Sequence, residues 1–169
     1  MADRLTASAA KILGAALSAS GRTVAVAESC TGGLLGGAIT SVPGSSLYFP
    51  GGVVAYGNRA KSSLLCVPPD LLAARGAVSR EVALAMAEGA LSLFRADLAI
   101  AVTGVAGPGG GTRGKPVGTM WVAVVAAGGV RYAHRFRFPG GRDAVRRETV
   151  RASLGVAIDV LRSEAAAGE

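Results

Sequence analysis

Apolar and polar positions recur along this chain with two different periods, and the alternation predicts helices and strands in turn. The first helical pattern is amphipathic and ends near Gly21; its apolar positions are Leu5, Ala9, Ile12, Leu13, Ala16 and Leu17. The continuous apolar run 23–27 is typical of a buried strand. The segment from about Gly32 to Val42 predicts a second helix, and residues 43–46 predict a turn.

The middle of the chain repeats this order. Residues 51–56 predict a second strand, and Asn58 is expected to cap a short helix through Leu65 that Pro68-Pro69 stops. A longer helix follows, with Ser79 as its expected cap and with Val82, Met86, Ala90 and Leu93 on one face. Residues 98–102 predict a third strand.

The last third of the chain predicts a hairpin and a helix. Two apolar runs, 117–127 and 130–138, flank Gly128-Gly129, which is a strong hairpin signal. A final helix is expected over 143–161, with a tail that frays after Ser163. Together the elements predict an α/β fold: a single domain over 1–169 with three α/β/α layers and a mixed sheet of about five strands, including a C-terminal β-hairpin.

Composition agrees with a folded domain, since half of the residues are hydrophobic and only 17% are charged. No apolar stretch approaches the roughly twenty residues that a membrane helix needs, and the N-terminus lacks the apolar centre of a signal peptide, so we expect a cytoplasmic protein without a membrane partner. Cys30 and Cys66 are too few for a disulfide scaffold and do not form a metal motif, so we expect no metal or cofactor; Cys66 best suits a small buried position.

The net charge of +7 raises the question of nucleic acid, but the basic residues cluster only at 131–137 and 142–151, with few aromatics between them. Nucleic acid is therefore an unlikely partner. Arginine dominates, and the only lysines are Lys11, Lys61 and Lys115. A lysine can lose its proton in a desolvated site whereas arginine cannot, so these three are of chemical interest.

The best candidate for a reactive site is the segment 28–33, Glu-Ser-Cys-Thr-Gly-Gly, between a strand and a helix. Unpaired backbone N–H groups at such a turn can hold a phosphate or a developing oxyanion. The alternative is that Ser29 and Thr31 only cap the helix. His134 lies within a hairpin strand and is expected to be solvated, which leaves Lys61 as the candidate base.

Topology favours a meeting of Ser29 and Lys61, because loops after neighbouring parallel strands gather at one edge of the sheet. A lysine desolvated there, beside Arg59 and a helix N-terminus, has reason to be neutral; the alternative is a solvated helix face. Near the C-terminus, Arg142 or Arg146 could receive an anion, or Asp143 could pair with Arg146 or Arg147.

The glycine-rich stretch contains two motifs that we reject. Residues 109–114 satisfy GxGxxG, and 109–115 satisfy most of a P-loop, but both motifs need a helix to follow, and 116–121 predicts a strand. What remains is either a loop over 103–108 that approaches a ligand or a long surface turn.

Six ordered motifs resemble the C-terminal domain of the CinA (competence-damage inducible) family over nearly the whole chain. They are Ala27 to Gly33, Pro43 to Ser46, Val54 to Asn58 with Lys61, Gly76 to Ser79, Thr103 to Pro108, and Lys115 to Gly118 with Arg142-Asp143. Standalone members are nicotinamide-mononucleotide amidohydrolases, and longer members carry an additional N-terminal domain.

The resemblance implies hydrolysis of the carboxamide of nicotinamide mononucleotide to the acid and ammonia, without a metal or cofactor, in a homo-oligomer that is expected to be a dimer. Ser29 would be the nucleophile, Lys61 its general base and Tyr56 a positioning group, although Cys30 and Thr31 are rival nucleophiles. The predicted substrate-binding residues are Glu28, Cys30, Thr31, Gly32, Gly33, Thr103, Gly104, Gly107 and Arg142. The alternatives are a non-catalytic nucleotide-binding module linked to competence or DNA damage and, less favoured, a nucleic-acid binder.

Overall fold

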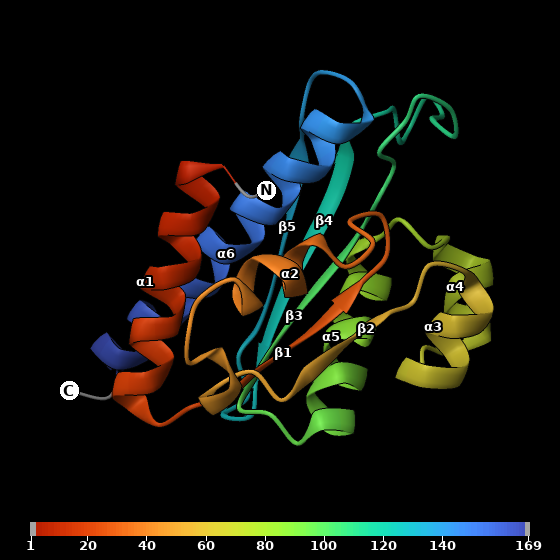
Figure 1. The fold of residues 1–169 in the computed structure, drawn as a ribbon. Helices are drawn as coiled ribbons and strands as arrows, with labels where there is room; N and C mark the ends of the chain where they lie inside the picture. The colour runs from red at the N-terminus through yellow and green to blue at the C-terminus, as the bar shows by residue number, and fades with distance from the viewer. Residues whose placement is uncertain (1–2, 168–169) are drawn as a thin grey trace.

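The computed structural model describes residues 3–167, which form one five-stranded mixed sheet between two layers of helices (Figure 1). The strands are β1 (Val24–Glu28), β2 (Gly51–Val54), β3 (Leu98–Gly104), β4 (Thr119–Ala126) and β5 (Arg131–Arg137), in the order β2-β1-β3-β4-β5. β1 pairs in parallel with both β2 and β3, whereas β3–β4 and β4–β5 are antiparallel. The predicted three-layer fold and the C-terminal hairpin are confirmed.

Helices α1, α2 and α6 cover one face of the sheet, and α3, α4 and α5 lie on the other side (Figure 1). Their bounds are α1 (Arg4–Ser20), α2 (Leu34–Thr40), α3 (Asn58–Leu65), α4 (Pro69–Arg75), α5 (Arg80–Phe94) and α6 (Arg142–Ala167), with a short 3-10 helix η1 (Ser45–Leu47). In residues 3–167, no helix combines the length and the apolar character needed to span a bilayer.

The two faces of the central strands differ in side-chain size, because successive side chains on a strand point to opposite faces. Val26, Ile100 and their neighbours face α1, α2 and α6, whereas alanines such as Ala27 and Ala101 face α5. Small side chains let α5 approach the sheet closely. The same close packing joins α5 to α3: a Cβ at Gly89 would lie 2.1 Å from the carbonyl oxygen of Leu65. This contact fixes α3, the helix that carries Lys61.

One prediction about helix ends was wrong. The N-cap of α3 is Gly57, and Asn58 is the first residue of the helix. Helix α3 runs through Leu65 as predicted, with Cys66 in a left-handed conformation at its end, and the proline pair also starts a helix, because Pro69 stands at the first position of α4. Proline fits that position since its missing N–H would have no helical partner there.

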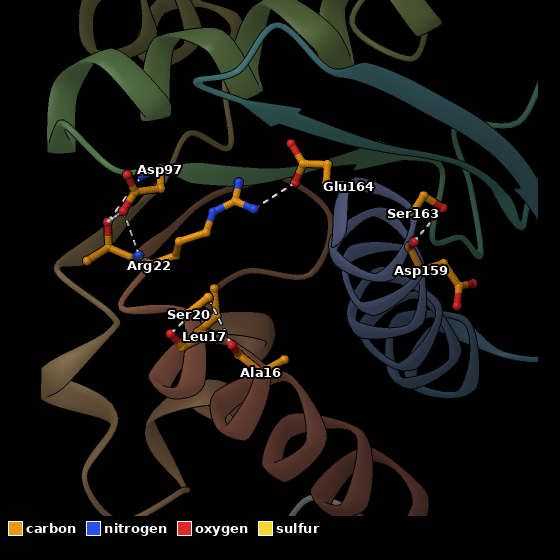
Figure 2. Close-up of polar contacts among 9 residues, drawn as sticks. Ala16, Leu17, Ser20, Arg22, Asp97, Asp159, Ser163 and Glu164 are labelled. Atoms are coloured by element: carbon orange, nitrogen blue, oxygen red, sulfur yellow. Dashed lines mark hydrogen bonds and ion pairs between the residues drawn. The ribbon is translucent and has the colours of Figure 1, made fainter. Parts of the chain in front are cut away.

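The end of α6 was also predicted incorrectly. The helix continues through Ala167 and does not fray after Ser163. Arg22 Nη1, between α1 and β1, donates to Glu164 Oε2 at 2.8 Å, so the last turns of α6 are tied to the opposite end of the chain (Figure 2). Ser163 Oγ also donates to the carbonyl oxygen of Asp159 within the helix.

The partly buried carboxylate of Asp97 lies near Arg22, and we expect its loss to lower the free energy of unfolding. Asp97 Oδ2 accepts hydrogen bonds from the Thr23 N–H and hydroxyl, both at 2.8 Å, and these bonds hold the pKa of Asp97 below its ordinary value of 3.8. A lowered pKa means that the folded state favours the carboxylate, so its stabilisation is present above pH 3.8 and is lost as the pH falls through the folded-state pKa.

We therefore expect Asp97→Asn to lower the free energy of unfolding at pH 7 by about 1–2 kcal/mol, because a hydrogen bond to a charged group contributes about 1.5–3 kcal/mol and partial exposure to solvent reduces this contribution. Urea unfolding at pH 7 and at pH 3 measures it. The difference between parent and variant should shrink at pH 3, and an equal difference at both pH values would contradict this interpretation.

Candidate active site

Three parallel strands end at the same edge of the sheet, and the candidate site is built on the loops that follow them. Ser29 comes directly after β1, and its N–H donates to the carbonyl oxygen of Val102 on β3 at 3.0 Å. On the other side of β1, the Ala55 N–H donates to the carbonyl oxygen of Glu28 at 2.8 Å. These bonds extend the sheet past the strand ends and fix the backbone from which the Ser29 side chain projects into a cavity of about 280 Å³.

Lys61 lies on α3 and reaches the same cavity. Its Nζ is 3.0 Å from Ser29 Oγ, 2.9 Å from the carbonyl oxygen of Ala55 and 3.1 Å from that of Tyr56. Only 1% of the residue is exposed. The structure thus brings together the hydroxyl and the amine that topology predicted to meet, and the alternative of a solvated helix face for Lys61 is wrong.

The protonation of Lys61 follows from this environment. Burial lowers the pKa of the Lys61 amine below its ordinary value of 10.5, and the neighbouring Cys30 opposes the shift. Arg59, which the sequence analysis placed beside it, is exposed and is not among the causes. A neutral amine has two N–H donors and one lone pair. The two carbonyl oxygens can only accept, so in the neutral form they take the two donors and leave the lone pair for the Ser29 hydroxyl proton, whereas the protonated form donates to Ser29 Oγ as well.

The Glu28 carboxylate has a structural role at the start of α2 that was not predicted from sequence. Its carboxylate accepts hydrogen bonds from the N–H groups at the start of α2, namely those of Gly33 (3.0 Å), Leu35 (3.1 Å) and Gly36 (2.8 Å). A carboxylate at this end also suits the helix dipole. The helix is therefore capped by Glu28, and the alternative reading of Ser29 and Thr31 as caps is wrong. Glu28 does not line the cavity.

The buried position predicted for Cys66 is wrong. Cys66 is exposed at the end of α3, whereas Cys30 is buried, with its thiol 3.4 Å from Met120 Sδ. Burial raises the pKa of the Cys30 thiol to about 12, so the sulfur is protonated at neutral pH. Since the thiolate is the nucleophilic form, Cys30 is a poor rival to Ser29.

Replacement of Cys30 tests this distinction. We expect Cys30→Ala to keep turnover within roughly threefold of the parent, because the thiol neither accepts nor delivers the reacting proton. Steady-state kinetics with an amide substrate measures the turnover of variant and parent. A loss comparable to that of Ser29→Ala, with folding intact by circular dichroism, would restore Cys30 as the nucleophile.

The mouth of the cavity is formed by Tyr56, Arg142 and the glycine-rich loop after β3. Arg142 donates from Nη2 to the Tyr56 hydroxyl at 2.8 Å and from Nη1 to the carbonyl oxygen of Gly107 at 2.9 Å. The Tyr56 residue is 59% exposed, and only its backbone carbonyl touches Lys61. Tyr56 therefore contributes to the serine–lysine pair through its main chain and to the rim through its side chain.

The floor of the cavity comes from the end of β3. Thr103 is buried, and its hydroxyl donates to the carbonyl oxygen of Ala77 at 2.8 Å, which joins the floor to the segment before α5. Gly104 has no room for a side chain, because a Cβ there would lie 2.0 Å from Met120 Sδ. Gly107 has φ +84°, a left-handed conformation that favours glycine.

The predicted substrate-binding residues separate into two groups. Those that line the cavity are Cys30, Thr103, Gly104, Gly107 and Arg142. Those that do not line it are Glu28, Thr31, Gly32 and Gly33. The lining also includes Ala77 and Val78, which the sequence placed only in a resemblance motif, and no helix begins within 109–115, as expected from the rejected phosphate-binding motifs.

Arg146, on α6, contacts the turn that follows Ser29. Its Nε donates to the carbonyl oxygen of Cys30 at 3.1 Å and its Nη2 to that of Thr31 at 2.8 Å. Its Nη1 lies 3.9 Å from Asp143 Oδ1, so Asp143 pairs with Arg146 and not with Arg147.

His134 is exposed on β5, between Tyr132 and Phe136, as predicted. Across residues 3–167, no three His, Cys, Asp or Glu side chains gather in a way that could hold a metal ion.

Sheet and cavity define the class of protein: an α/β domain whose parallel strands present a buried serine–lysine pair at their carboxyl edge. The chain belongs to the CinA C-terminal domain family, whose model matches residues 6–161. A CinA-like protein of Mycolicibacterium gilvum is 52% identical over 148 residues, which are 88% of this chain and 34% of that protein. The chain thus spans about a third of the length of such curated relatives.

Solved structures match over nearly their whole length. The competence/damage inducible protein of Agrobacterium tumefaciens is 42% identical with a TM-score of 0.93, covering 96% of this chain and 98% of that one. A CinA superfamily protein of Klebsiella pneumoniae is 36% identical with a TM-score of 0.90, covering 94% and 98%. The family predicted from the motifs is confirmed.

Proposed function

We propose that this protein is a nicotinamide-mononucleotide amidohydrolase that uses Ser29 as nucleophile and Lys61 as general base. The observation that carries the proposal is the 3.0 Å contact between Ser29 Oγ and a buried lysine amine whose pKa is lowered by burial. Serine needs a neighbouring base to act as a nucleophile near neutral pH; Lys61 has the reach, and burial shifts its amine toward the neutral form that accepts a proton. The choice of substrate rests on the resemblance to the standalone family members.

In the first half of the reaction, Ser29 Oγ attacks the carboxamide carbon while its proton passes to Lys61 Nζ. The tetrahedral intermediate then collapses as the carbon–nitrogen bond breaks. The leaving nitrogen takes the proton from Lys61 and departs as ammonia. Lys61 is thereby returned to its neutral form, and an ester links the substrate to Ser29.

In the second half, water attacks the ester carbonyl and gives a proton to Lys61. The carbon–oxygen bond to Ser29 breaks, and Lys61 returns the proton to Ser29 Oγ. Nicotinic acid mononucleotide leaves as the product. One lysine thus serves as base and acid in both halves, which requires no second titrating group.

The negative oxygen of the intermediates needs donors, and the turn after Ser29 offers one at the cavity. Of the four amides from Cys30 to Gly33, those of Gly32 and Gly33 already donate, to the Ser29 carbonyl oxygen and to Glu28. The amides of Cys30 and Thr31 donate to no backbone oxygen within residues 3–167, and both lie near the Cys30 thiol. We assign the Cys30 amide as an oxyanion donor, because Cys30 lines the cavity and Thr31 does not, with Thr103 and Gly104 forming the floor.

The size of the cavity suits one end of the substrate. A volume of about 280 Å³ accommodates a pyridine carboxamide, and the ribose phosphate would extend past the rim. Arg142 is exposed at that rim, at the N-terminus of α6, where a phosphate is favoured both by the guanidinium and by the helix dipole.

Ammonia release from nicotinamide mononucleotide is the test of this function. We expect stoichiometric ammonia and nicotinic acid mononucleotide from the parent protein, and none from Ser29→Ala. Tight binding of the nucleotide without ammonia would favour a non-catalytic nucleotide-binding module, and steeply salt-dependent binding of DNA would favour a nucleic-acid binder.

The pH dependence of the reaction follows from the base. Because Lys61 must be neutral to accept the proton, kcat/KM should rise with pH and level off above the pKa of Lys61 in the free enzyme. Burial lowers that pKa, so the midpoint should fall below 10.5. Initial rates in overlapping buffers measure it; a profile that falls as pH rises would contradict a lysine base.

A further inference from the structure

We infer that Arg146 is a positioning residue for the reaction, which fixes the backbone of Cys30 and Thr31 and thereby holds the Ser29 hydroxyl and the Cys30 N–H in place at the cavity. The inference rests on the proposed function. Arg146 lies on α6, more than a hundred residues from the turn that it holds. It touches neither Ser29 nor Lys61, so its effect passes through the backbone.

Arg146 holds the turn after Ser29 at two points. The guanidinium donates from two nitrogens to two successive carbonyl oxygens, those of Cys30 and Thr31. Arginine has a rigid planar fork of donors, and two bonds from one fork fix the position and the rotation of the peptide groups that accept them. A single point charge such as a lysine amine would hold them less well.

The shape of the peptide bond links the direction of each carbonyl to that of the next N–H. In a trans peptide, the C=O of one residue and the N–H of the next point in opposite directions. When the Cys30 carbonyl faces Arg146, the Thr31 N–H therefore faces away from α6. The amides of Cys30 and Thr31 lie near the Cys30 sulfur, where they partly offset the effect of burial on its pKa. Cys30 follows Ser29 directly and lines the cavity whereas Thr31 does not, so a rotation of the held peptide group would displace the Cys30 N–H and the Ser29 side chain.

The Arg146 guanidinium is largely buried and lies close to Gly32. Only 24% of the Arg146 side chain is exposed, so its bonds are largely protected from water. Gly32 has φ +59°, and a Cβ there would lie 3.2 Å from Arg146 Nη2. Glycine at this position therefore permits both the turn and the approach of the arginine. Glu28 fixes the far end of the same turn through α2, so the turn is held from two sides.

The experiment compares Arg146→Ala and Arg146→Lys with Arg147→Ala and Arg147→Lys. Arg147 is exposed and makes no hydrogen bond or ion pair within residues 3–167, which makes it a matched control on the same helix. Two reactions are followed. One is hydrolysis of nicotinamide mononucleotide, and the other is phosphonylation of Ser29 by a fluorophosphonate, in which the Ser29 oxygen bonds to phosphorus, fluoride leaves and the proton goes to Lys61.

We expect Arg146→Ala to lower kcat by about 10²-fold, the range for loss of one oxyanion donor, with KM within about threefold of the parent. Labelling of Ser29 should slow by a similar factor, and Arg146→Lys should recover only part of either rate. The midpoint of the pH profile should stay in place, because Lys61 is untouched. Millimolar guanidinium should restore part of the activity of Arg146→Ala and none of the activity of Ser29→Ala. Both Arg147 variants should match the parent.

Several results would overturn the inference. They are parental rates in a folded Arg146→Lys, a loss confined to KM, and a shifted pH midpoint, which would place the effect on Lys61. If Arg146→Ala does not fold, Arg146→Lys decides alone. A parent that is labelled at Ser29 but releases no ammonia would refute the proposed substrate, and the labelling rates would still judge Arg146. A parent that is not labelled at Ser29 would overturn the positioning role together with the nucleophile.

Discussion

Ser29→Ala is expected to lower turnover of nicotinamide mononucleotide by at least about 10³-fold, because no other group in the cavity can replace the hydroxyl. Thr31 does not line the cavity, and the Cys30 thiol is protonated at neutral pH. Lys61 loses one hydrogen-bond partner, so the free energy of unfolding should change by only about 1 kcal/mol. Ammonia assays and urea unfolding measure the two effects.

Ser63→Ala is the matched control for this variant, since Ser63 lies exposed on α3 outside the cavity. It should match the parent in both assays. Residual turnover above about a tenth in a folded Ser29→Ala would remove Ser29 as the nucleophile.

Lys61→Met is expected to lower turnover by about 10²–10⁴-fold, the usual contribution of a general base. Methionine fills a similar volume without an amine, so the serine proton has no acceptor. The change leaves the buried Ala55 carbonyl without this donor, but it also removes the cost of burying an amine. These effects oppose each other, and we expect the free energy of unfolding to shift by less than about 2 kcal/mol.

Lys11→Met, at an exposed position on α1, is the control for loss of a lysine charge and should keep parental turnover. Parental turnover in a folded Lys61→Met would contradict the assignment of the base. A loss of activity that follows a loss of folded protein would likewise count against it, since the account predicts a folded and inactive variant.

The meeting of Ser29 and Lys61 could be predicted from sequence because it depends on topology. Apolar runs marked the parallel strands, and the rule that their following loops gather at one edge placed the two side chains together. Desolvation of the lysine, which lowers its pKa, could be predicted only as one of two alternatives. The extent of its burial depends on how α3 packs against elements distant in sequence, such as α5 at Gly89.

The role of Glu28 was missed although a signal was present. Side chains alternate along a strand, so Glu28 shares a face with Val24 and Val26, and that face packs against α1, α2 and α6. Strand parity therefore predicts that the Glu28 carboxylate points toward α2 and not into the cleft. Chemical type alone had suggested substrate contact.

Other features depend on contacts that local pattern does not contain. Arg22 and Glu164 are 142 residues apart in sequence, so the local pattern after Ser163 could not predict the ion pair that ties the last turns of α6 to Arg22. Cys66 itself ends α3 in a left-handed conformation. Glycine or asparagine is the usual sequence signal for such a helix end, so a cysteine gave no indication of it. Arg146 was identified as an anion receptor candidate, but its actual partners are backbone carbonyls from another element.

The most direct test of the account is to trap the covalent intermediate. Protein mixed with nicotinamide mononucleotide is quenched in acid within the first turnovers, digested and examined by mass spectrometry. We predict a nicotinic acid mononucleotide acyl group, bound as an ester, on the peptide that contains Ser29, and its loss on treatment with hydroxylamine. Ammonia release with no adduct on that peptide, or with the adduct on Cys30, would contradict a Ser29 nucleophile activated by Lys61.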